Sequence, residues 1–490
     1  MDNIKQTSLW RDTTIFPGYA PLKGDVQTDV AIIGGGLAGI LTAHFLEQAG
    51  RQCIVLEADR IGSGQTGNTT AKITSQHGLI YRKLIGSVGK EGAWQYAAAN
   101  QEAIERYRIL VRKYGIDCEW SERNAYLYTT KDARLLRQEC RAAESLGIPV
   151  ELTDRTELPF SVEAALKFKK QASFHPLKFL RRMAEQVKVF EQTKVLRAEP
   201  QLLVTDRGNI RADQIVFAGH YPFVLRPGYY FLRMHQERSY VLGLTNVVPV
   251  SGMYLGVDSD ALSFRQSGNV LLLGGGGHRT GDGERGNPYD YLYHKVEKYF
   301  PHARTAYQWS AQDCMPLDGI PYIGQFGKKT EGWFVATGFQ KWGMTTSMVA
   351  AMVLTDLMCG RSNAYADVFS PQRFNVLASA KLFLEEGKYA VTSLAKEKFT
   401  FPKETLEDIR PGTGGVVEYE GQKAGVYKEE NGEVYAVSIK CPHLGCQLAW
   451  NQSEKSWDCP CHGSRYDYRG RLLDGPAQTA SVACGLKQGI

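Results

Sequence analysis

Two short loops near the end of the chain concentrate side chains that bind metals. The stretch CPHLGCQLAWNQSEKSWDCPCHGSRY, residues 441–466, holds six candidate ligands: Cys441, His443, Cys446, Cys459, Cys461 and His462. Thiolates and imidazoles suit a tetrahedral zinc site, and they also suit an iron–sulfur cluster in which two histidines replace two cysteines on one iron.

The number and spacing of the ligands favour the cluster. Six candidates exceed the four that zinc takes, and each loop offers both a cysteine and a histidine. The patterns C-x-H-L-G-C and C-P-C-H-G-S resemble those of Rieske [2Fe–2S] domains, and the resemblance covers residues 406–490. It implies that thiolates hold one iron and imidazoles the other, the ligands being Cys441 and Cys459, and His443 and His462.

The same resemblance gives roles to the residues around the cluster. Cys446 and Cys461 match the pair that forms a disulfide between the loops in respiratory-type Rieske proteins, and we expect it to be shielded from the cytosol. Ser464 and Tyr466 match hydroxyls that hydrogen-bond to the cluster, while Gly475-Pro476 matches the proline loop that covers it. Such donors raise the reduction potential toward the upper part of the range of about −150 to +300 mV.

The segment around these loops predicts a small all-β domain. The chain becomes polar and lysine-rich after Leu384, and the stretch from Gly414 to Gly445 alternates β-branched and aromatic residues, with a turn at Asn431-Gly432. We expect a linker at 386–405 and a Rieske domain at 406–490, behind a larger domain at 1–385.

The start of that larger domain predicts a dinucleotide-binding fold. An apolar run, Val30 to Ile33, precedes Gly34, Gly36 and Gly39 in the pattern G-x-G-x-x-G, and residues of helical spacing follow. The first two glycines allow a tight turn and the approach of a pyrophosphate, and the third allows the helix to pack on the sheet. Glu57 ends the next strand, where a carboxylate binds ribose hydroxyls.

Several separated segments in 29–358 resemble the FAD-dependent D-amino-acid oxidase-like family. They are ADRIGSGQTGNTTAK (58–72), QIVFAGHYPF (214–223), PLDGIPYIG (316–324) and WFVATGFQKWGMTTS (333–347). The resemblance implies a Rossmann-type α/β FAD domain with an interleaved α+β substrate domain. It also implies that FAD contacts Thr69 and Thr70, and Gly338 and Gly343, where a helix N-terminus could face the flavin.

The substrate site departs from the family. Members that act on amino acids are expected to carry an arginine shortly before the Pro-x-Asp segment, because guanidinium binds a carboxylate with two hydrogen bonds. Gln312 and Asp313 stand there instead, which argues against a simple amino acid and allows a cationic amine. Cys314 lies nearby, but its offset from Asp318 does not match the family's covalent flavin position.

Other candidate residues carry weaker signals. The glycine-rich run Leu271 to Gly286 lacks the helix of a second dinucleotide site, which argues against NADH, and we expect it to border the substrate cavity. Lys72 and His77 could approach the flavin. Four isolated histidines are expected to be structural rather than catalytic: His175, His220, His235 and His278.

Composition excludes several classes of function. The formal net charge is +6 over 490 residues, without a basic run that would favour nucleic acid. The longest apolar stretch, Met348 to Met358, is short and contains Asp356, so it predicts no transmembrane segment. With no signal peptide at the start, we expect a cytoplasmic protein.

Together the two halves predict a flavin-dependent dehydrogenase. FAD would take two electrons from a small amine or amino-acid-like substrate, and the cluster would carry them singly to an external acceptor, a protein or a quinone. A Rieske oxygenase is disfavoured because no histidine follows His462 to bind a second iron. The alternative is a non-catalytic redox sensor or an electron-transfer flavoprotein.

Overall fold

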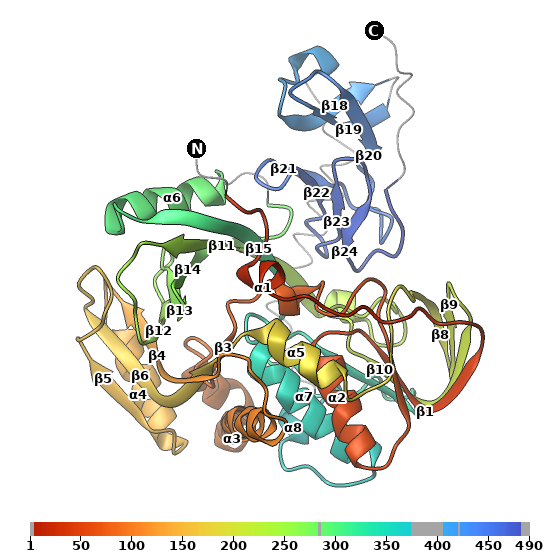
Figure 1. The fold of residues 1–490 in the computed structure, drawn as a ribbon, viewed down its shortest axis with the longest axis horizontal. Coiled ribbons are helices and arrows are strands. Elements are labelled where there is room, and N and C mark those ends of the chain that lie inside the picture. Colours follow the sequence, from red (N-terminus) through yellow and green to blue (C-terminus); the bar gives the residue numbers. More distant parts are fainter. Residues whose placement is uncertain (1–3, 283–285, 374–404, 420–421, 482–490) are drawn as a thin grey trace.

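The computed structural model describes residues 4–282, 286–373, 405–419 and 422–481. Residues 386–404 of the predicted linker lie outside this set. An 8-stranded and a 9-stranded sheet build the front of the chain, and sheets of 3 and 4 strands build residues 405–481, which we call the β domain (Figure 1).

The first sheet confirms the predicted dinucleotide fold. Its order is β16-β17-β10-β1-β2-β7. The apolar strand β1 (Val26–Ile33) pairs in parallel with β2 (Cys53–Leu56) and with β10 (Asn209–Phe217). The other strands are β7 (Val189–Phe190), β8 (Val195–Glu199), β9 (Leu202–Thr205), β16 (Tyr322–Gln325) and β17 (Trp333–Thr337).

Two buried helices cover this sheet. Helices α2 (Leu37–Gln48) and α7 (Gly343–Met358) pack against each other, and both are apolar around most of their circumference, as a helix buried on several sides must be. The remaining helices are α1 (Leu9–Asp12), α3 (Tyr81–Lys113), α4 (Arg134–Ser145), α5 (Pro176–Ala184), α6 (Pro288–Tyr299) and α8 (Ala366–Phe369), with short 3₁₀ turns η1 (Gln65–Gly67), η2 (Tyr230–Leu232) and η3 (Leu406–Asp408). Within the described ranges, no helix combines the length and apolarity needed to cross a membrane.

The second sheet is interleaved with the first along the chain. Its order is β15-β11-β14-β13-β12-β4-β6-β3, with β5 paired to β6. The long strands β11 (Met234–Thr245) and β15 (Arg304–Pro316) form its edge. The others are β3 (Lys72–Ile73), β4 (Ser121–Thr129), β5 (Val150–Thr153), β6 (Ala164–Ser173), β12 (Met253–Gly256), β13 (Ser263–Ser267) and β14 (Val270–Arg279). This sheet is the predicted α+β substrate domain.

The β domain contains no long helix among its described residues. One sheet comprises β18 (Gly414–Tyr419), β19 (Gln422–Lys428) and β20 (Val434–Ser438); the other comprises β21 (Ala449–Asn451), β22 (Ser456–Asp458), β23 (Arg465–Asp467) and β24 (Leu472–Asp474). Trp457 and Tyr466 are fully buried in its core. In Figure 1, β21 to β24 lie beside β15.

Strands β11 and β15 form a wall with two different faces. Side chains of a strand alternate between the faces, and partners across an antiparallel pair share a face. Arg238 pairs with Gln312, whereas Glu237 pairs with Asp313. Arg238 and Gln312 contact the β domain, whereas Asp313 lines a cavity.

Candidate functional site: a cavity and a cysteine–histidine centre

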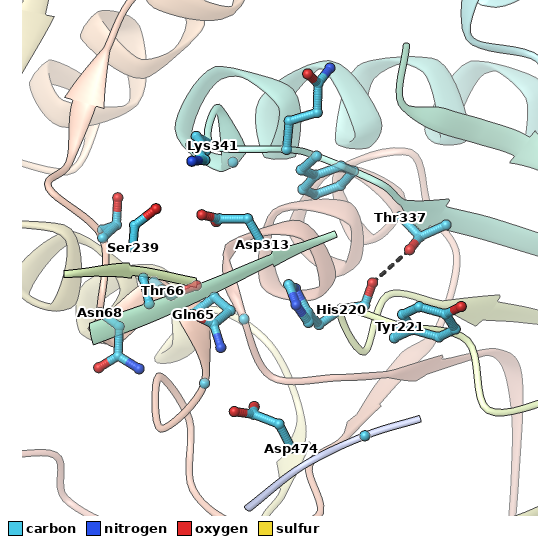
Figure 2. A pocket seen from close by; sticks show the side chains of 18 of the residues that line it. Gln65, Thr66, Asn68, His220, Tyr221, Ser239, Asp313, Thr337, Lys341 and Asp474 are labelled. Carbon is cyan, nitrogen blue, oxygen red and sulfur yellow. Dashed lines mark hydrogen bonds between the residues drawn. The ribbon is translucent and has the colours of Figure 1, made fainter. Parts of the chain in front are cut away.

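A cavity of about 1060 Å³ extends from the dinucleotide fold to the β domain. Its lining includes the first glycines after β1, the N-terminus of α7, residues of β11, β14 and β15, and residues 472–478. Figure 2 shows Asp313 from the wall and Asp474 from the β domain in the same close view. The cavity therefore brings three parts of the chain to one space.

The glycines after β1 act as the sequence predicts for a tight turn. Gly34 has φ +114°, and a Cβ there would lie 2.7 Å from the carbonyl oxygen of Ala218. A Cβ at Gly39 would lie 2.0 Å from the carbonyl oxygen of Gly34, so only glycine lets α2 approach β1 this closely. Gly34 and Gly36 line the cavity, while Gly39 lies behind them in the packing.

Glu57 is held at the end of β2 by backbone donors. The N–H groups of Gly35 and Asp59 donate to its two carboxylate oxygens over 2.7 and 2.9 Å. Burial raises the pKa of this carboxyl group, and these two hydrogen bonds oppose the rise. Glu57 lines the cavity, which suits an acceptor for ribose hydroxyls.

Of the other predicted flavin contacts, three line the cavity and one does not. Thr69, Thr70 and Gly343 line the cavity, and Gly343 begins α7, whose first N–H groups have no partner within the helix. Gly338 lies outside the lining. It has φ +72°, and a Cβ there would lie 2.6 Å from Cγ of Pro316, so this glycine serves the turn after β17.

Lys72 and His77 have different surroundings. Lys72 lines the cavity, where its ammonium donates to the carbonyl oxygen of Tyr254 over 3.2 Å and to the Ser263 hydroxyl; burial lowers its pKa to about 7. His77 is buried outside the lining, against Tyr96 and Thr74. Of this pair, Lys72 is the one that could meet a ligand.

Among the histidines expected to be structural, His220 and His278 line the cavity. His175 caps α5, where its Nδ1 accepts from the backbone N–H of Lys178 over 3.3 Å. Cys314 is buried with its sulfur 3.3 Å from Nε2 of His220, and it is not part of the lining.

Two loops of the β domain repeat one backbone pattern. In the first, the N–H of Cys441 donates to the carbonyl of Cys446, and the N–H of Gly445 donates to Cys441, both over 2.9 Å. In the second, the N–H of Cys459 donates to Ser464 over 2.8 Å and that of Gly463 to Cys459 over 2.9 Å. Gly445 and Gly463 both have φ above +80°, which glycine allows at little cost.

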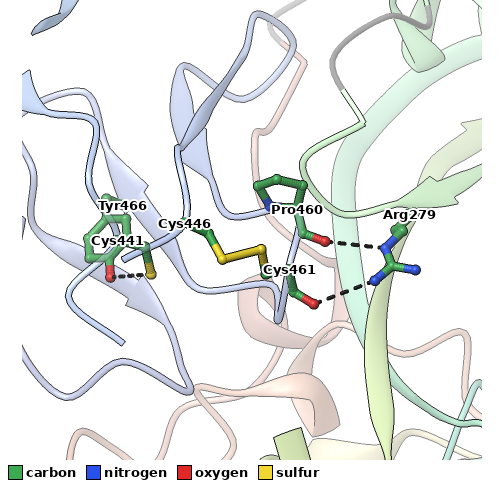
Figure 3. The surroundings of a disulfide bond; sticks show 6 residues. All are labelled: Arg279, Cys441, Cys446, Pro460, Cys461 and Tyr466. Atoms are coloured by element: carbon green, nitrogen blue, oxygen red, sulfur yellow. Dashed lines mark hydrogen bonds between the residues drawn. A yellow bond between two sulfur atoms is a disulfide. The ribbon is translucent and has the colours of Figure 1, made fainter. Parts of the chain in front are cut away.

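The loops bring four free donor groups together. A disulfide joins Cys446 to Cys461 and takes both sulfurs out of the candidate set, as Figure 3 shows. The thiols of Cys441 and Cys459 stay free and buried, and the rings of His443 and His462 lie 4.8 Å apart between centroids. Each ring keeps a buried Nδ1 with no hydrogen-bond partner among the described residues. Such an arrangement suits two metal atoms, one with sulfur and one with nitrogen ligands.

Electrostatics favour the metal-binding protonation state of both histidines and of Cys441, whereas the hydrogen bond to Cys441 and burial raise the pKa of the Cys459 thiol. Burial lowers the pKa of His443 to about 4 and that of His462 to about 3, so both rings are neutral at neutral pH. Hydrogen bonding from Cys459 lowers the pKa of the Cys441 thiol to about 6, and the hydroxyls of Tyr466 and Ser464 contribute in the same direction. The Tyr466 oxygen lies 3.7 Å from the Cys441 sulfur.

The second loop contacts the wall. The side chain of Gln236 donates to the carbonyl oxygens of His462 over 2.7 Å and Gly475 over 3.0 Å, and that of Gln312 donates to Gly463 over 2.8 Å. From β14, Arg279 donates to Pro460 over 3.2 Å (Figure 3).

Glycines at this contact allow the wall and the β domain to approach closely. A Cβ at Gly463 would lie 2.6 Å from Cβ of Gln236, and one at Gly281 would lie 2.4 Å from the backbone nitrogen of Pro460. The ring of Phe231 packs edge-on against both His443 and His462, at 6.3 and 5.8 Å between centroids. Beside these contacts, Arg238 forms a buried ion pair with Glu454.

Comparison with known proteins decides the family. Residues 29–357 match the family model described as FAD dependent oxidoreductase, and residues 401–486 match the Rieske [2Fe-2S] domain. The chain belongs to the FAD-dependent oxidoreductase family and carries a C-terminal Rieske domain. It is therefore an enzyme whose cofactors are FAD and a [2Fe–2S] cluster.

Individual relatives agree with this architecture. A Bacillus subtilis protein described as a Rieske 2Fe-2S iron-sulfur protein, YhfW, is 36% identical over 96% of each chain. The gamma-glutamylputrescine oxidoreductase of Escherichia coli is 24% identical over 71% of this chain and 89% of its own. The crystal structure of glycine oxidase from Geobacillus kaustophilus has a TM-score of 0.60 at 19% identity, covering 71% of this chain and 99% of that one, so it supports the fold.

The residues present fit both cofactors of the Rieske flavoprotein. The glycine turn, Glu57 and the N-termini of α2 and α7 converge on one cavity, as a dinucleotide requires. Two buried thiols and two unpartnered imidazole nitrogens meet in the Rieske domain. Sequence patterns did not identify the residues that join the two sites, among them Gln236, Arg279 and Phe231, because none of them belongs to a motif.

Proposed function

We propose that this enzyme is a dehydrogenase that oxidises a small amine and passes the electrons through its own Rieske cluster to an external acceptor, a protein or a quinone. The observation that carries the proposal is the wall formed by β11 and β15. One face of these strands lines the cavity, and the other face binds the loop that contains His462 and Gly463. Asp313 lies in the cavity lining, and its neighbour Gln312 bonds to the loop of His462.

The assignment of ligands rests on the donor atoms that meet between the two loops. Cys441 and Cys459 would bind one iron, and His443 and His462 the other. The disulfide between the loops and the hydroxyls of Ser464 and Tyr466 would hold this set in place, because hydrogen bonds to metal ligands fix their orientation and tune the metal.

On the FAD side, the pyrophosphate would lie against Gly34 and Gly36, the ribose against Glu57, and the flavin between Thr69, Thr70 and the N-terminus of α7 at Gly343. Gly39 and Gly338 would serve by allowing the turns and close packing around the cofactor.

Amine oxidation releases two electrons together, whereas the proposed cluster carries one electron at a time. Oxidation of an amine C–N bond to an imine releases two electrons and two protons, and water then hydrolyses the imine to a carbonyl compound and ammonia, or to a carbonyl compound and an amine when the nitrogen is alkylated. When bound, FAD supplies a two-electron acceptor that can release electrons singly, and the cluster supplies a one-electron carrier. Each turnover would therefore reduce two equivalents of a one-electron acceptor.

The protein's own residues would fix the two centres relative to each other. Gln236 and Gln312 are fully or almost fully buried, so their hydrogen bonds to the cluster loop are not in competition with water. The Escherichia coli relative, named a gamma-glutamylputrescine oxidoreductase, supports an amine as the substrate.

Anaerobic stopped-flow spectroscopy tests the proposal. The holoenzyme is mixed with members of a panel of primary amines, N-methylated amines and amino acids, and flavin and cluster absorbance are followed separately. We expect flavin reduction by an amine, then cluster reduction with a first-order rate constant that does not depend on enzyme concentration. A flavin that is reduced beside a permanently oxidised cluster contradicts the intramolecular route, and no turnover of any panel member with an artificial acceptor supports a redox sensor instead.

A further inference from the structure

The cavity wall contains a carboxylate that has no ion pair among the described residues. Of the acidic residues that line the cavity, Asp313 alone has no hydrogen bond or ion pair within the described residues. Figure 2 shows its side chain in the middle of the lining, between residues of the wall and of the loop before α7.

The other acidic residues of the lining are all engaged. Glu57 accepts from the backbone, Asp59 accepts from Gln192 over 3.0 Å, and Asp260 pairs with Lys131 over 2.8 Å. Asp474 pairs with Arg465 over 3.3 Å. Asp313 is therefore the acidic group that a ligand could bind without displacing a protein partner.

The basic residues of the lining are engaged as well. Lys341 pairs with Glu237 over 3.1 Å, Lys194 donates to the carbonyl of Gln478 over 2.5 Å, and Lys72 donates to Tyr254 and Ser263. No arginine lines the cavity among the residues that the structure describes. Lys341 is paired with a carboxylate, and Lys72 and Lys194 already donate to neutral groups of the protein, so a substrate carboxylate would have to compete with these partners.

Strand pairing places a second carboxylate beside Asp313. It stands directly opposite Glu237 on β11, and two like charges in this position repel each other. Lys341 neutralises Glu237, and there is room for it because the neighbouring residue on β14 is Gly277, where a Cβ would lie 3.2 Å from the Lys341 nitrogen. Lys341 and His235 both lie beside Glu237, and Asp313 is left without an ion pair among the described residues.

We infer that Asp313 binds a second cationic group of the substrate, so that the enzyme acts on amines that carry another ammonium at a distance and no carboxylate nearby. This inference rests on the proposed function. The group on Asp313 is not the nitrogen that reacts, because hydride leaves a carbon beside a neutral amine far more readily than beside an ammonium, and an ammonium paired with a carboxylate keeps its proton.

Three compounds with the same four-carbon chain test the inference: putrescine, butylamine and gamma-aminobutyrate. Dissociation constants are measured with the holoenzyme from the perturbation of the flavin spectrum, and flavin reduction is followed without oxygen. Loss of one partner of a buried charge pair costs about 2 kcal/mol or more, which is roughly 30-fold in affinity. Putrescine should therefore bind at least about 30-fold more tightly than butylamine, and gamma-aminobutyrate should bind most weakly.

Substitutions test whether Asp313 is the residue that causes the preference for putrescine. Asp313→Asn should reduce putrescine affinity to that of butylamine and leave butylamine unchanged, without lowering the melting temperature, since it removes a charge that has no partner. Glu237→Gln is the second variant: it frees Lys341 to pair with Asp313 and should also weaken putrescine binding. Asp260→Asn, a lining carboxylate already paired with a lysine, is the matched control and should keep the putrescine preference.

The inference is wrong if putrescine binds no better than butylamine, if gamma-aminobutyrate binds as well as putrescine, or if Asp313→Asn weakens both amines equally. The readout is binding and flavin reduction, not cluster reduction. If Asp313 does not select the substrate, the same traces can still show electron transfer from the flavin to the cluster. If that electron transfer fails, the preference for putrescine can still be measured from binding and flavin reduction.

Discussion

Gln312 donates from its side-chain nitrogen to the carbonyl oxygen of Gly463 over 2.8 Å, which ties the substrate sheet to the residue that follows a proposed cluster ligand. The same nitrogen donates to Gln236 over 2.7 Å, and Gln236 in turn bonds to His462. These two glutamines form a buried polar bridge between the sheet and the cluster loop. The bridge fixes the position of the loop that contains His462 and Gly463 relative to the cavity.

Replacing Gln312 with alanine should slow electron transfer between the cofactors. The substitution removes the Gln312 donor from the carbonyl oxygen of Gly463 and from the side-chain oxygen of Gln236, which costs about 1–3 kcal/mol for each buried group. We expect a cluster reduction rate lower by about tenfold or more in stopped-flow traces, with an unchanged rate of flavin reduction. Gln308→Ala on the same strand, where the side chain meets Tyr293 instead, is the control. Equal slowing of both phases in Gln312→Ala would contradict a bridging role.

The wall also shows what the sequence could and could not predict. Glycine spacing, apolar runs and the cysteine–histidine patterns each report on a local segment, so both folds and both cofactors could be predicted. Adjacent in the sequence, Gln312 and Asp313 are both predicted to lie at the substrate site. Strand alternation sends them to opposite faces, and only the pairing of β15 with β11 shows which face meets the β domain. Contacts such as that of Phe231 with the two histidines join distant segments and leave no local pattern.

Glu454→Gln should destabilise the contact between the two parts of the enzyme. The Glu454 carboxylate is paired with Arg238 from the wall and with Arg465 from its own domain, and all three groups are almost fully buried. Breaking a buried ion pair from one side costs about 3–5 kcal/mol because the other charge stays buried. We expect a melting temperature lower by several degrees and faster proteolysis. Glu418→Gln, at an exposed carboxylate, is the control. Unchanged melting would show that water already screens the pair.

Tyr466→Phe should lower the reduction potential of the cluster. The hydroxyl lies 3.7 Å from the Cys441 sulfur, where it can donate to a ligand that gains negative charge on reduction. A hydrogen bond worth about 1.4 kcal/mol to the reduced state corresponds to about 60 mV for one electron. Redox titration followed by electron paramagnetic resonance measures the shift. Tyr468→Phe, whose ring packs on Tyr427 and Tyr435, should leave the potential unchanged. An equal shift in both variants would indicate a general change of packing.

The binding of a cationic amine should strengthen as pH rises through about 7. Burial raises the pKa of Asp313, with Lys341 and Arg238 opposing the rise and Glu237 adding to it, and the resulting pKa is about 7. His220, Tyr221, His278 and Asp474 are further titratable groups that line the cavity. The carboxylate that binds the cation is present above this pKa and is lost as pH falls below it. The dissociation constant for putrescine should therefore decrease between about pH 6 and 8.

The control for this prediction is the variant without the titrating group. In Asp313→Asn, the dissociation constant for putrescine should vary no more with pH than that for butylamine does in the unaltered enzyme. A pH dependence that survives in Asp313→Asn would assign the titration to another group of the lining. A pH dependence shared equally by putrescine and butylamine would assign it to the reacting amine, because butylamine has no second cation for Asp313 to bind.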